Sequence, residues 1–410
     1  MLKNYFKIAI AVLRRRKFFT FISLFGISLT LTILLVLTAF LEKIAGDSYP
    51  DRKRDRSLYV TRMSERTKDN GMSSGPLSFY YFDHYVRSLK TPVKLGITNG
   101  YESTNTYVNN KKINVSYKYT NADYWDIMEY DFIEGKAFTK QQIDKGDRVT
   151  VISEAMKKEY FGDVPSVVGK YFEADNINYR VIGVVKNVPI TSYMTYSDIY
   201  LPYTVAKTDF TKDKGYRGRF YGILLANSKA DLPRMRAEYE DMVKRLPMER
   251  PEFIKIHSHA GSYIVSYVDT GDENRSGMTF VLTTIAIFVL LVMLLPTLNL
   301  VNINITRIME RSSEIGVRKA FGASSNTLVY QFIVENIILT LLGGAIGVVL
   351  SFVAIEVLNS ANLIPYLVLS LNFSVLAIGL LICFLFGLLS GVYPAWRMSK
   401  LNVVTALKAQ

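Results

Sequence analysis

The segment ERSSEIGVRKAFGAS, residues 310–324, carries charges of both signs and lies between two long apolar runs. Glu314 and Arg318 are four residues apart, in the order that stabilises a helix. Gly322 can end that helix in a left-handed conformation, and Ser324 can cap the next one. These residues predict a short helix, a tight break and a second helix. On periodicity alone, the simpler interpretation is a solvated hairpin that only joins two membrane spans.

The apolar runs around this segment are long enough to cross a membrane. Phe18–Leu41 has 24 residues without a charge. At about 1.5 Å per residue a helix of that length reaches roughly 36 Å, more than the ~30 Å of hydrocarbon in a bilayer. Its length, and the lack of a small-x-small site after it, favour an uncleaved anchor over a signal peptide. The four expected spans are residues 18–41, 277–305, 329–357 and 372–396.

The later spans contain polar residues and glycines with specific structural implications. Pro296 predicts a kink in the second span, and Asn299 and Asn302 share a helix face suited to hydrogen bonding with a neighbouring helix. The uncharged part of the third span is placed at Ile337–Ile355, between Glu335 and Glu356, because a carboxylate at the bilayer centre costs about 2.5–3.5 kcal/mol. Small residues four apart allow helices to approach closely. The glycines expected to serve this packing are Gly343, Gly344, Gly347, Gly387 and Gly391.

The distribution of cations sets the orientation. Residues 1–17, 306–328 and 397–410 carry net charges of +6, +2 and +3, which supply 11 of the 13 net positive charges. Positive flanks stay in the cytoplasm, so both termini and the 306–328 segment are expected inside, with 42–275 and the short loop 358–371 outside. Apolar residues at helical spacing predict that residues 1–17 form an amphipathic helix on the inner leaflet. The expected location is the cell inner (cytoplasmic) membrane.

Residues 42–275 have the pattern of a folded soluble domain. RVTVIS (148–153) and YRVIGVVKNV (179–188) are strand-like, whereas LPRMRAEYEDMVKRL (232–246) is helix-like. Strands and helices alternate without a regular long βαβ period, which favours an α+β fold. Of the 27 tyrosines 23 lie here, and we expect them in the core. The predicted fold class is a membrane protein of four transmembrane α-helices, with a large α+β extracytoplasmic domain between helices 1 and 2.

Patterns typical of catalysis or metal binding are not evident. GDVPSVVGKY (162–171) has neither the glycine spacing nor the hydroxyl residue of a phosphate-binding loop. His257 and His259 share a strand face, but no third ligand completes a metal site. Cys383 is the only cysteine, which excludes an internal disulfide. We expect no enzyme activity and no metal, and the absence of a basic stripe with interleaved aromatics argues against nucleic-acid binding.

Residues 310–347 resemble the signature of the FtsX/MacB-like permeases of ABC transporters. In that family a charged E-R-x-x-E-I-G run precedes a Q-F-x-x-E element, matched here by Gln331, Phe332 and Glu335, and then a glycine-rich membrane helix. The closing YPAWRMSKLNVVTALK (393–408) resembles the family's C-terminal pattern, except for Val403 where proline is usual. Residues 148–189 resemble the MacB-type periplasmic core domain.

The resemblance implies a mechanism based on mechanical transmission. Family members have four spans, and two permease copies, identical or paralogous, pair with two copies of a cytoplasmic ABC ATPase. The segment between the second and third spans is a coupling helix that sits in a groove of that ATPase. In this sequence the matching residues are Glu310, Arg311, Glu314, Ile315, Gly316, Arg318, Lys319, Ala320 and Gly322.

The chain contains no Walker A loop, so ATP and Mg²⁺ are expected in the partner ATPase and no cofactor in this chain. The expected function is export of a drug, peptide or similar substrate from the periplasmic side. Within the family, regulation of cell-wall hydrolases and lipoprotein release are alternatives. Outside it, a membrane sensor without an ATPase is the alternative. Whether a membrane-fusion adaptor and an outer-membrane channel take part is left open.

Overall fold

The computed structural model describes residues 17–46, 49–108, 110–273, 276–310, 325–374, 376–381, 384–385 and 388. These residues form two compact units. The helical unit takes its described residues from Met1–Glu42, Thr283–Leu363 and Val368–Gln410. The second unit, here called the sheet domain, consists of Lys43–Leu282 and Ile364–Leu367.

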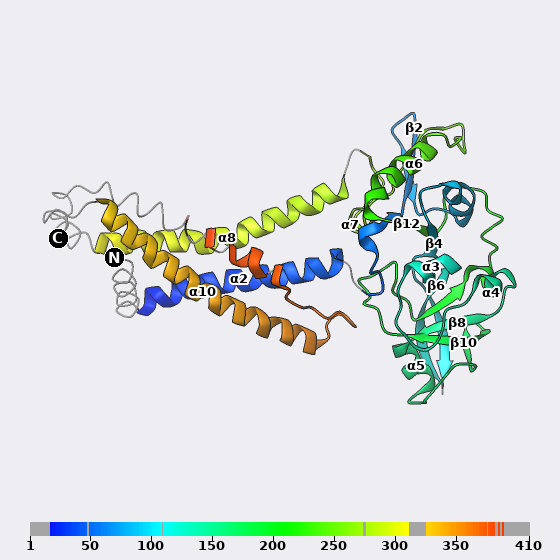
Figure 1. Ribbon diagram of the computed structural model, residues 1–410, viewed down its shortest axis with the longest axis horizontal. Coiled ribbons are helices and arrows are strands. Elements are labelled where there is room, and N and C mark those ends of the chain that lie inside the picture. The colour runs from blue at the N-terminus through cyan, green and yellow to red at the C-terminus, as the bar shows by residue number, and fades with distance from the viewer. Residues whose placement is uncertain are drawn as a thin grey trace. The chain divides into compact units, whose positions relative to one another are not determined.

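Three long helices pass through the helical unit: α2 (Lys17–Ala45), α8 (Gly277–Glu310) and α10 (Ser325–Ala361) (Figure 1). Each contains a stretch long and apolar enough to cross a membrane, at Lys17–Ala45, Gly277–Leu294 and Ile333–Ala361. The expected fourth span, 372–396, lies largely outside the described residues, so a total of four spans stays a prediction.

One face of α2 is buried and the other is not. Its buried residues recur at helical spacing, whereas Phe21 and Phe25 are exposed, as expected of a face that contacts lipid. Glu335 and Asn336 on α10 are also buried within the protein. That position shields the carboxylate from lipid, where its charge would be costly.

The sheet domain contains a mixed ten-stranded sheet in the order β1-β12-β4-β6-β11-β8-β10-β7, with β5 paired to β6 and β9 to β10. β10 is parallel to β8 and β11 is parallel to β6, and the other pairs are antiparallel. The strands are β1 (Ser57–Val60), β4 (Lys94–Asn99), β5 (Glu102–Val108), β6 (Lys111–Thr120), β7 (Phe132–Gly135), β8 (Val149–Ser153), β9 (Tyr171–Ala174), β10 (Ile177–Val185), β11 (Ile199–Pro202) and β12 (Phe220–Leu225).

A second sheet has the order β13-β2-β3. Its strands are β2 (Met63–Thr67), β3 (Met72–Gly75) and β13 (Phe253–Ser258). The helices of this domain are α3 (Ala122–Ile127), α4 (Lys140–Asp144), α5 (Glu154–Phe161), α6 (Leu232–Lys244) and α7 (Tyr263–Tyr267). The runs predicted as strands at 148–153 and 179–188 form β8 and β10, and the run predicted as a helix forms α6.

The large sheet is buried on both faces because its side chains alternate between two apolar clusters. On β12, Phe220 and Leu224 belong to one cluster, and Ile223 and Leu225 to the other. Several tyrosines lie in these clusters, among them Tyr124 and Tyr200, which are fully buried. Tyr200 donates from its hydroxyl to the main-chain oxygen of Thr195 at 2.7 Å. The prediction that the tyrosines build the core is confirmed at these positions.

Candidate functional site

The predicted coupling helix is described only at its ends. α8 extends to Glu310 and α10 begins at Ser325. Residues 311–324 lie outside the described part of the chain, so their helical state and their contact with an ATPase stay predictions. The predicted coupling residues that fall there are Arg311, Glu314, Ile315, Gly316, Arg318, Lys319, Ala320 and Gly322.

Two of the predicted packing glycines lie against α2. A Cβ built on Gly343 would lie 2.7 Å from Cγ2 of Ile27, and one on Gly347 would lie 2.9 Å from the main-chain oxygen of Ser28. Thr32 Oγ1 donates to the main-chain oxygen of Gly347 at 3.2 Å. Any larger residue at Gly343 or Gly347 would therefore push α2 and α10 apart.

The other glycines differ in their surroundings. A Cβ on Gly344 would lie 3.6 Å from its nearest neighbour, Leu380, which is ordinary contact. Gly387 and Gly391 lie outside the described residues. Gly379 was not among the predicted packing glycines, although a Cβ there would lie 2.6 Å from Leu35. No second glycine four positions away marks Gly379 out in the sequence.

A buried ion pair lies where the chain passes from α2 into the sheet domain. Arg54 Nε donates to Asp51 at 2.8 Å, and the two side chains are 6% and 1% exposed. Arg54 Nη1 also donates to the main-chain oxygens of Ile44 and Gly46, at 3.0 and 2.5 Å. The last carbonyls of a helix have no partner within the helix and favour a nearby cation. Arg54 thus satisfies the C-terminal end of α2.

The same ion pair contacts the segment that leads towards α8. Cζ of Arg54 lies 3.6 Å from the ring centroid of Tyr263, at the start of α7. Tyr59 donates its hydroxyl to Asp51, with 2.9 and 2.8 Å to the two carboxylate oxygens. Burial, and then the charge of Asp51, raise the pKa of Tyr59 well above its usual range, so its hydroxyl keeps its proton. We call Asp51, Arg54, Tyr59 and Tyr263 the junction cluster.

Main-chain bonds join the two segments that carry this cluster. Tyr59 on β1 exchanges two hydrogen bonds with Gly261, at 2.8 and 3.0 Å. Ser266 on α7 donates from Oγ to the main-chain oxygen of Tyr59 at 2.8 Å, and Thr61 Oγ1 donates to the main-chain oxygen of Ser266 at 3.1 Å. The incoming segment (49–61) and the outgoing segment (261–268) are therefore paired side by side.

The start of α8 is packed against the end of the outgoing segment. A Cβ on Gly277 would lie 1.8 Å from the main-chain oxygen of Val268. Only glycine fits this approach without a shift of the backbone. The paired segments therefore extend from the last turn of α2 to the first residue of α8.

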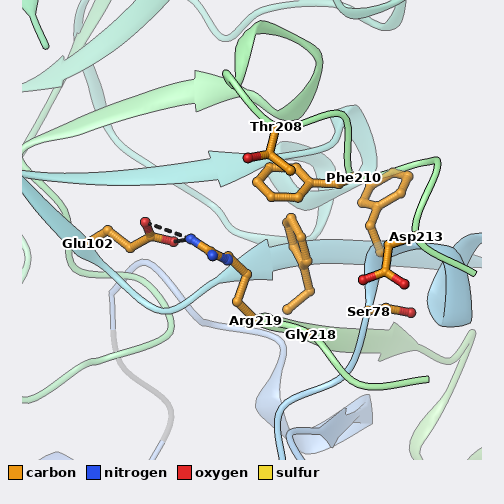
Figure 2. A pocket seen from close by; sticks show the side chains of 9 residues that line it. Ser78, Glu102, Thr208, Phe210, Asp213, Gly218 and Arg219 are labelled. Carbon is orange, nitrogen blue, oxygen red and sulfur yellow. Dashed lines mark hydrogen bonds and ion pairs between the residues drawn. The ribbon is translucent and has the colours of Figure 1, made fainter. Parts of the chain in front are cut away.

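A separate pocket of about 390 Å³ opens in the sheet domain (Figure 2). Its residues come from the start of β5, the start of β12, the stretch before β4 and the connection between β11 and β12. It is lined by Ser78, Phe79, Glu102, Thr208, Phe210, Asp213, Gly218, Arg219 and Phe220. Sequence analysis did not identify it, because no motif links these dispersed segments.

The two histidines considered as metal ligands lie close together but without a complete ligand set. The ring centroids of His257 and His259 are 6.0 Å apart. His257 Nδ1 is 3.8 Å from Glu273, and His259 Nδ1 is 3.8 Å from Asp269. Across the described ranges no group of three or more potential ligands could hold a metal ion.

Comparison with known proteins gives two matches to sequence families. Residues 20–242 match the MacB-like periplasmic core domain, and residues 286–403 match the FtsX-like permease C-terminal domain. Among curated proteins, the chain is 25% identical over 356 residues to the uncharacterized ABC transporter permease YknZ of Bacillus subtilis, covering 86% of this chain and 84% of YknZ.

Two further relatives are longer proteins. The chain is 27% identical over 314 residues to the macrolide export ATP-binding/permease protein MacB of Wolinella succinogenes, covering 75% of this chain and 46% of MacB. It is 26% identical over 293 residues to the pyoverdine export ATP-binding/permease protein PvdT of Pseudomonas aeruginosa, covering 71% and 42%. The chain thus spans less than half the length of these two relatives.

Solved structures give weaker matches. The extracellular domain of the noncanonic ABC-type transporter YknZ from Gram-positive bacteria matches with a TM-score of 0.36 and 15% identity, over 48% of this chain and 100% of that one. The periplasmic region of MacB from Actinobacillus actinomycetemcomitans matches with a TM-score of 0.34 and 17% identity, over 49% and 88%.

Proposed function

Because the chain belongs to the family of ABC transporter permeases with a MacB-like periplasmic core domain and an FtsX-like permease domain, we propose that it transmits the motion of a separate ATPase across the membrane. Two copies of a cytoplasmic ABC ATPase would bind and hydrolyse ATP, and two permease copies would form the membrane part. The work done on the far side is export of a substrate. The MacB and PvdT relatives are named as macrolide and pyoverdine export proteins, which favours export over cell-wall regulation or lipoprotein release.

The junction cluster is the observation that carries this proposal. A domain that only had to be held near a membrane could hang on a flexible linker. Here Arg54 instead bonds the last turn of α2, and the incoming and outgoing segments are bonded to each other. Ile44 and Gly46 belong to the sheet domain itself, so the segment by which the chain enters this domain is bonded to it and is suited to transmit a displacement.

The proposed topology places four spans in the inner membrane, with both termini and the coupling segment in the cytoplasm. The three long apolar helices support the first three spans. The sheet domain then lies outside, between the first and second spans. The motion would start at residues 311–324 and reach the sheet domain through the helices.

Co-purification with an ABC ATPase tests the proposal. Exchanging Glu314 and Arg318 in a double variant, E314R/R318E, keeps the net charge and the spacing of the two charges but reverses their order along the chain. We expect this variant to lose the ATPase. The matched control exchanges the exposed pair Lys140 and Asp144 on α4, which are 2.8 Å apart, and should change nothing. Retention of the ATPase by E314R/R318E, or no ATPase with the unmodified chain, would overturn the proposal.

A further inference from the structure

The pocket in Figure 2 has an aromatic wall with charged groups on both sides. The ring centroid of Phe210 lies 4.8 Å from that of Phe220, which lies 5.6 Å from that of Phe79. Phe79 and Phe220 are buried, and Phe210 is half-buried. In Figure 2, Arg219 and Glu102 lie on one side of Phe210 and Asp213 lies on the other.

The wall of this pocket is held in place by main-chain contacts. Gly218 approaches Ser78 so closely that a Cβ on Gly218 would lie 2.7 Å from the Ser78 Cα. Leu77 and Phe220 exchange two main-chain hydrogen bonds, at 3.1 and 2.8 Å. A ligand would therefore meet a preformed surface and would not have to order it, which reduces the cost of binding.

The charges on the two sides of the pocket are not equivalent. Arg219 Nη1 donates to both oxygens of Glu102, at 2.9 and 3.0 Å. Glu102 also accepts from Asn99 Nδ2 and from the Tyr117 hydroxyl, both at 3.0 Å. The positive charge of Arg219 is thus neutralised inside the pocket by a carboxylate that is itself held in position.

Asp213 has no such compensation. Its Oδ1 accepts a hydrogen bond from the main-chain nitrogen of Gly215 at 3.0 Å. Among the residues that the structure describes, no cation forms an ion pair with this carboxylate. With Glu102 and Arg219 cancelling, the lining carries one net negative charge, next to the half-buried ring of Phe210, and the face of such a ring attracts cations.

We propose that this pocket binds an organic cation, with its ammonium group beside Asp213 and its apolar part against Phe79, Phe210 and Phe220. A volume of about 390 Å³ suits a small amphipathic molecule or one end of a larger one. An anion would meet repulsion from Asp213 and would have to displace Glu102 from Arg219. This assignment rests on the proposed function: if the chain takes part in export, the organic cation is the class of substrate that the sheet domain would take up.

Equilibrium dialysis of the full-length chain in phosphatidylcholine nanodiscs tests this inference. The probe is benzyltrimethylammonium, with benzenesulfonate as an anion of similar size and empty nanodiscs as the blank. We expect saturable binding of the cation and at least about tenfold weaker binding of the anion. Equal affinities, a preference for the anion, or no saturable cation binding at millimolar concentrations would overturn the proposal.

Three variants test whether each charged side chain strengthens or weakens binding of the cation. Asp213→Asn should weaken binding of the cation by about tenfold, because it removes the uncompensated charge. Arg219→Gln should strengthen it several-fold, because it releases Glu102. Asp163→Asn removes an exposed carboxylate outside the pocket and should have no effect. Equal thermal unfolding temperatures for the four chains exclude loss of folding as the cause.

This test is separate from that of the proposed function. The dialysis contains no ATPase, so cation binding can occur even if no ATPase associates with the chain. If an ATPase co-purifies and yet benzyltrimethylammonium does not bind, only the assignment of this pocket fails. If Arg219→Gln weakens binding of the cation, the pocket does not select ligands by the charge balance proposed here.

Discussion

Arg54 donates a hydrogen bond from Nη1 to the main-chain oxygen of Ile44 at 3.0 Å, so a buried guanidinium holds the last turn of the first membrane helix. The guanidinium is bonded to Asp51 and stacked on Tyr263 as well. It therefore contacts three parts of the chain at once: the last turn of α2, the segment that holds Asp51, and α7. Substitutions of Arg54 are therefore suited to distinguish an effect on the transmission of motion from an effect on the stability of the fold.

Arg54→Met should destabilise the chain and uncouple it from its ATPase. The substitution leaves Asp51 buried without its partner, which typically costs about 3–5 kcal/mol. Arg54→Lys keeps the charge, but its single nitrogen cannot occupy the positions of both Nε and Nη1. Compared with Arg54→Met, it should therefore retain most of the stability but less of the coupling. The measurements are the rate of ATP hydrolysis by the partner ATPase in nanodiscs that contain the chain, and the thermal unfolding temperature. Arg52→Met, which removes an exposed pair with Asp131, is the control and should leave both values unchanged.

Gly347→Ala should loosen the packing of α2 on α10. The added methyl group would meet the main-chain oxygen of Ser28, which cannot rotate away, and overpacking of this kind costs about 1–3 kcal/mol. Gly344→Ala on the same helix adds the same methyl group where ordinary contact distances remain. A lower unfolding temperature for Gly347→Ala than for Gly344→Ala is expected. Equal unfolding temperatures for the two variants would show that the close approach of α2 and α10 at Gly347 does not contribute to stability.

Lys118 should make the sheet domain more stable as the pH rises. Its Nζ is fully buried and donates to the main-chain oxygens of Asn99 and Tyr193, at 2.7 Å each. Burial lowers the pKa of Lys118 from its usual value to about 7, so between pH 7 and 10 the unfolded chain binds a proton that the folded chain does not. The free energy of unfolding should therefore rise with pH by about 1.4 kcal/mol per unit in this window and be constant, for this group, below it.

A comparison of the parent chain with the Lys118→Met variant checks this. The fluorescence of Trp125, which lies in α3, reports unfolding of the domain in a Trp396→Phe background. The variant has no titrating group at this position, so the change in unfolding temperature between pH 7.5 and pH 9 should be larger for the parent chain. The same change in both chains would mean that Lys118 is charged in the folded state.

Accessibility labelling should place the coupling segment and the sheet domain on opposite sides of the membrane. In a Cys383→Ser background, Ser312→Cys should react with an impermeant maleimide only after the cells are opened. Asp163→Cys, in an exposed loop of the sheet domain, should react on intact cells, or on spheroplasts if an outer membrane is present. Labelling of Ser312→Cys from outside would reverse the proposed orientation.

Much of the helical part could be predicted from the sequence because the apolar composition of a short segment is enough to indicate a membrane span. The uncharged run at 18–41 lies within α2. The family resemblances of residues 148–189 and 310–347 are confirmed by the matches over 20–242 and 286–403, respectively. The spacing of Gly343 and Gly347 indicated a close approach. It could not indicate α2 as the neighbouring helix, because a glycine pattern describes one surface only.

The junction cluster could not be predicted because it depends on contacts between distant residues. RKRDR, residues 52–56, has the composition of a solvated surface, and only Arg54 among its cations is buried. Its ring contact, Tyr263, is more than two hundred residues away in the chain. Lys118 was equally hidden, since the alternation in β6 does not reveal that both faces of the sheet are covered.

The pairing of Tyr59 with Gly261 also has an evolutionary consequence. Since the polypeptide comes in and goes out at neighbouring points, Lys43–Leu282, which make up nearly all of the sheet domain, are an insertion between α2 and α8. Insertions with adjacent ends are readily exchanged in proteins. A lineage could thus replace this domain with another and keep the same long helices, provided that the new domain closes its ends in the same way.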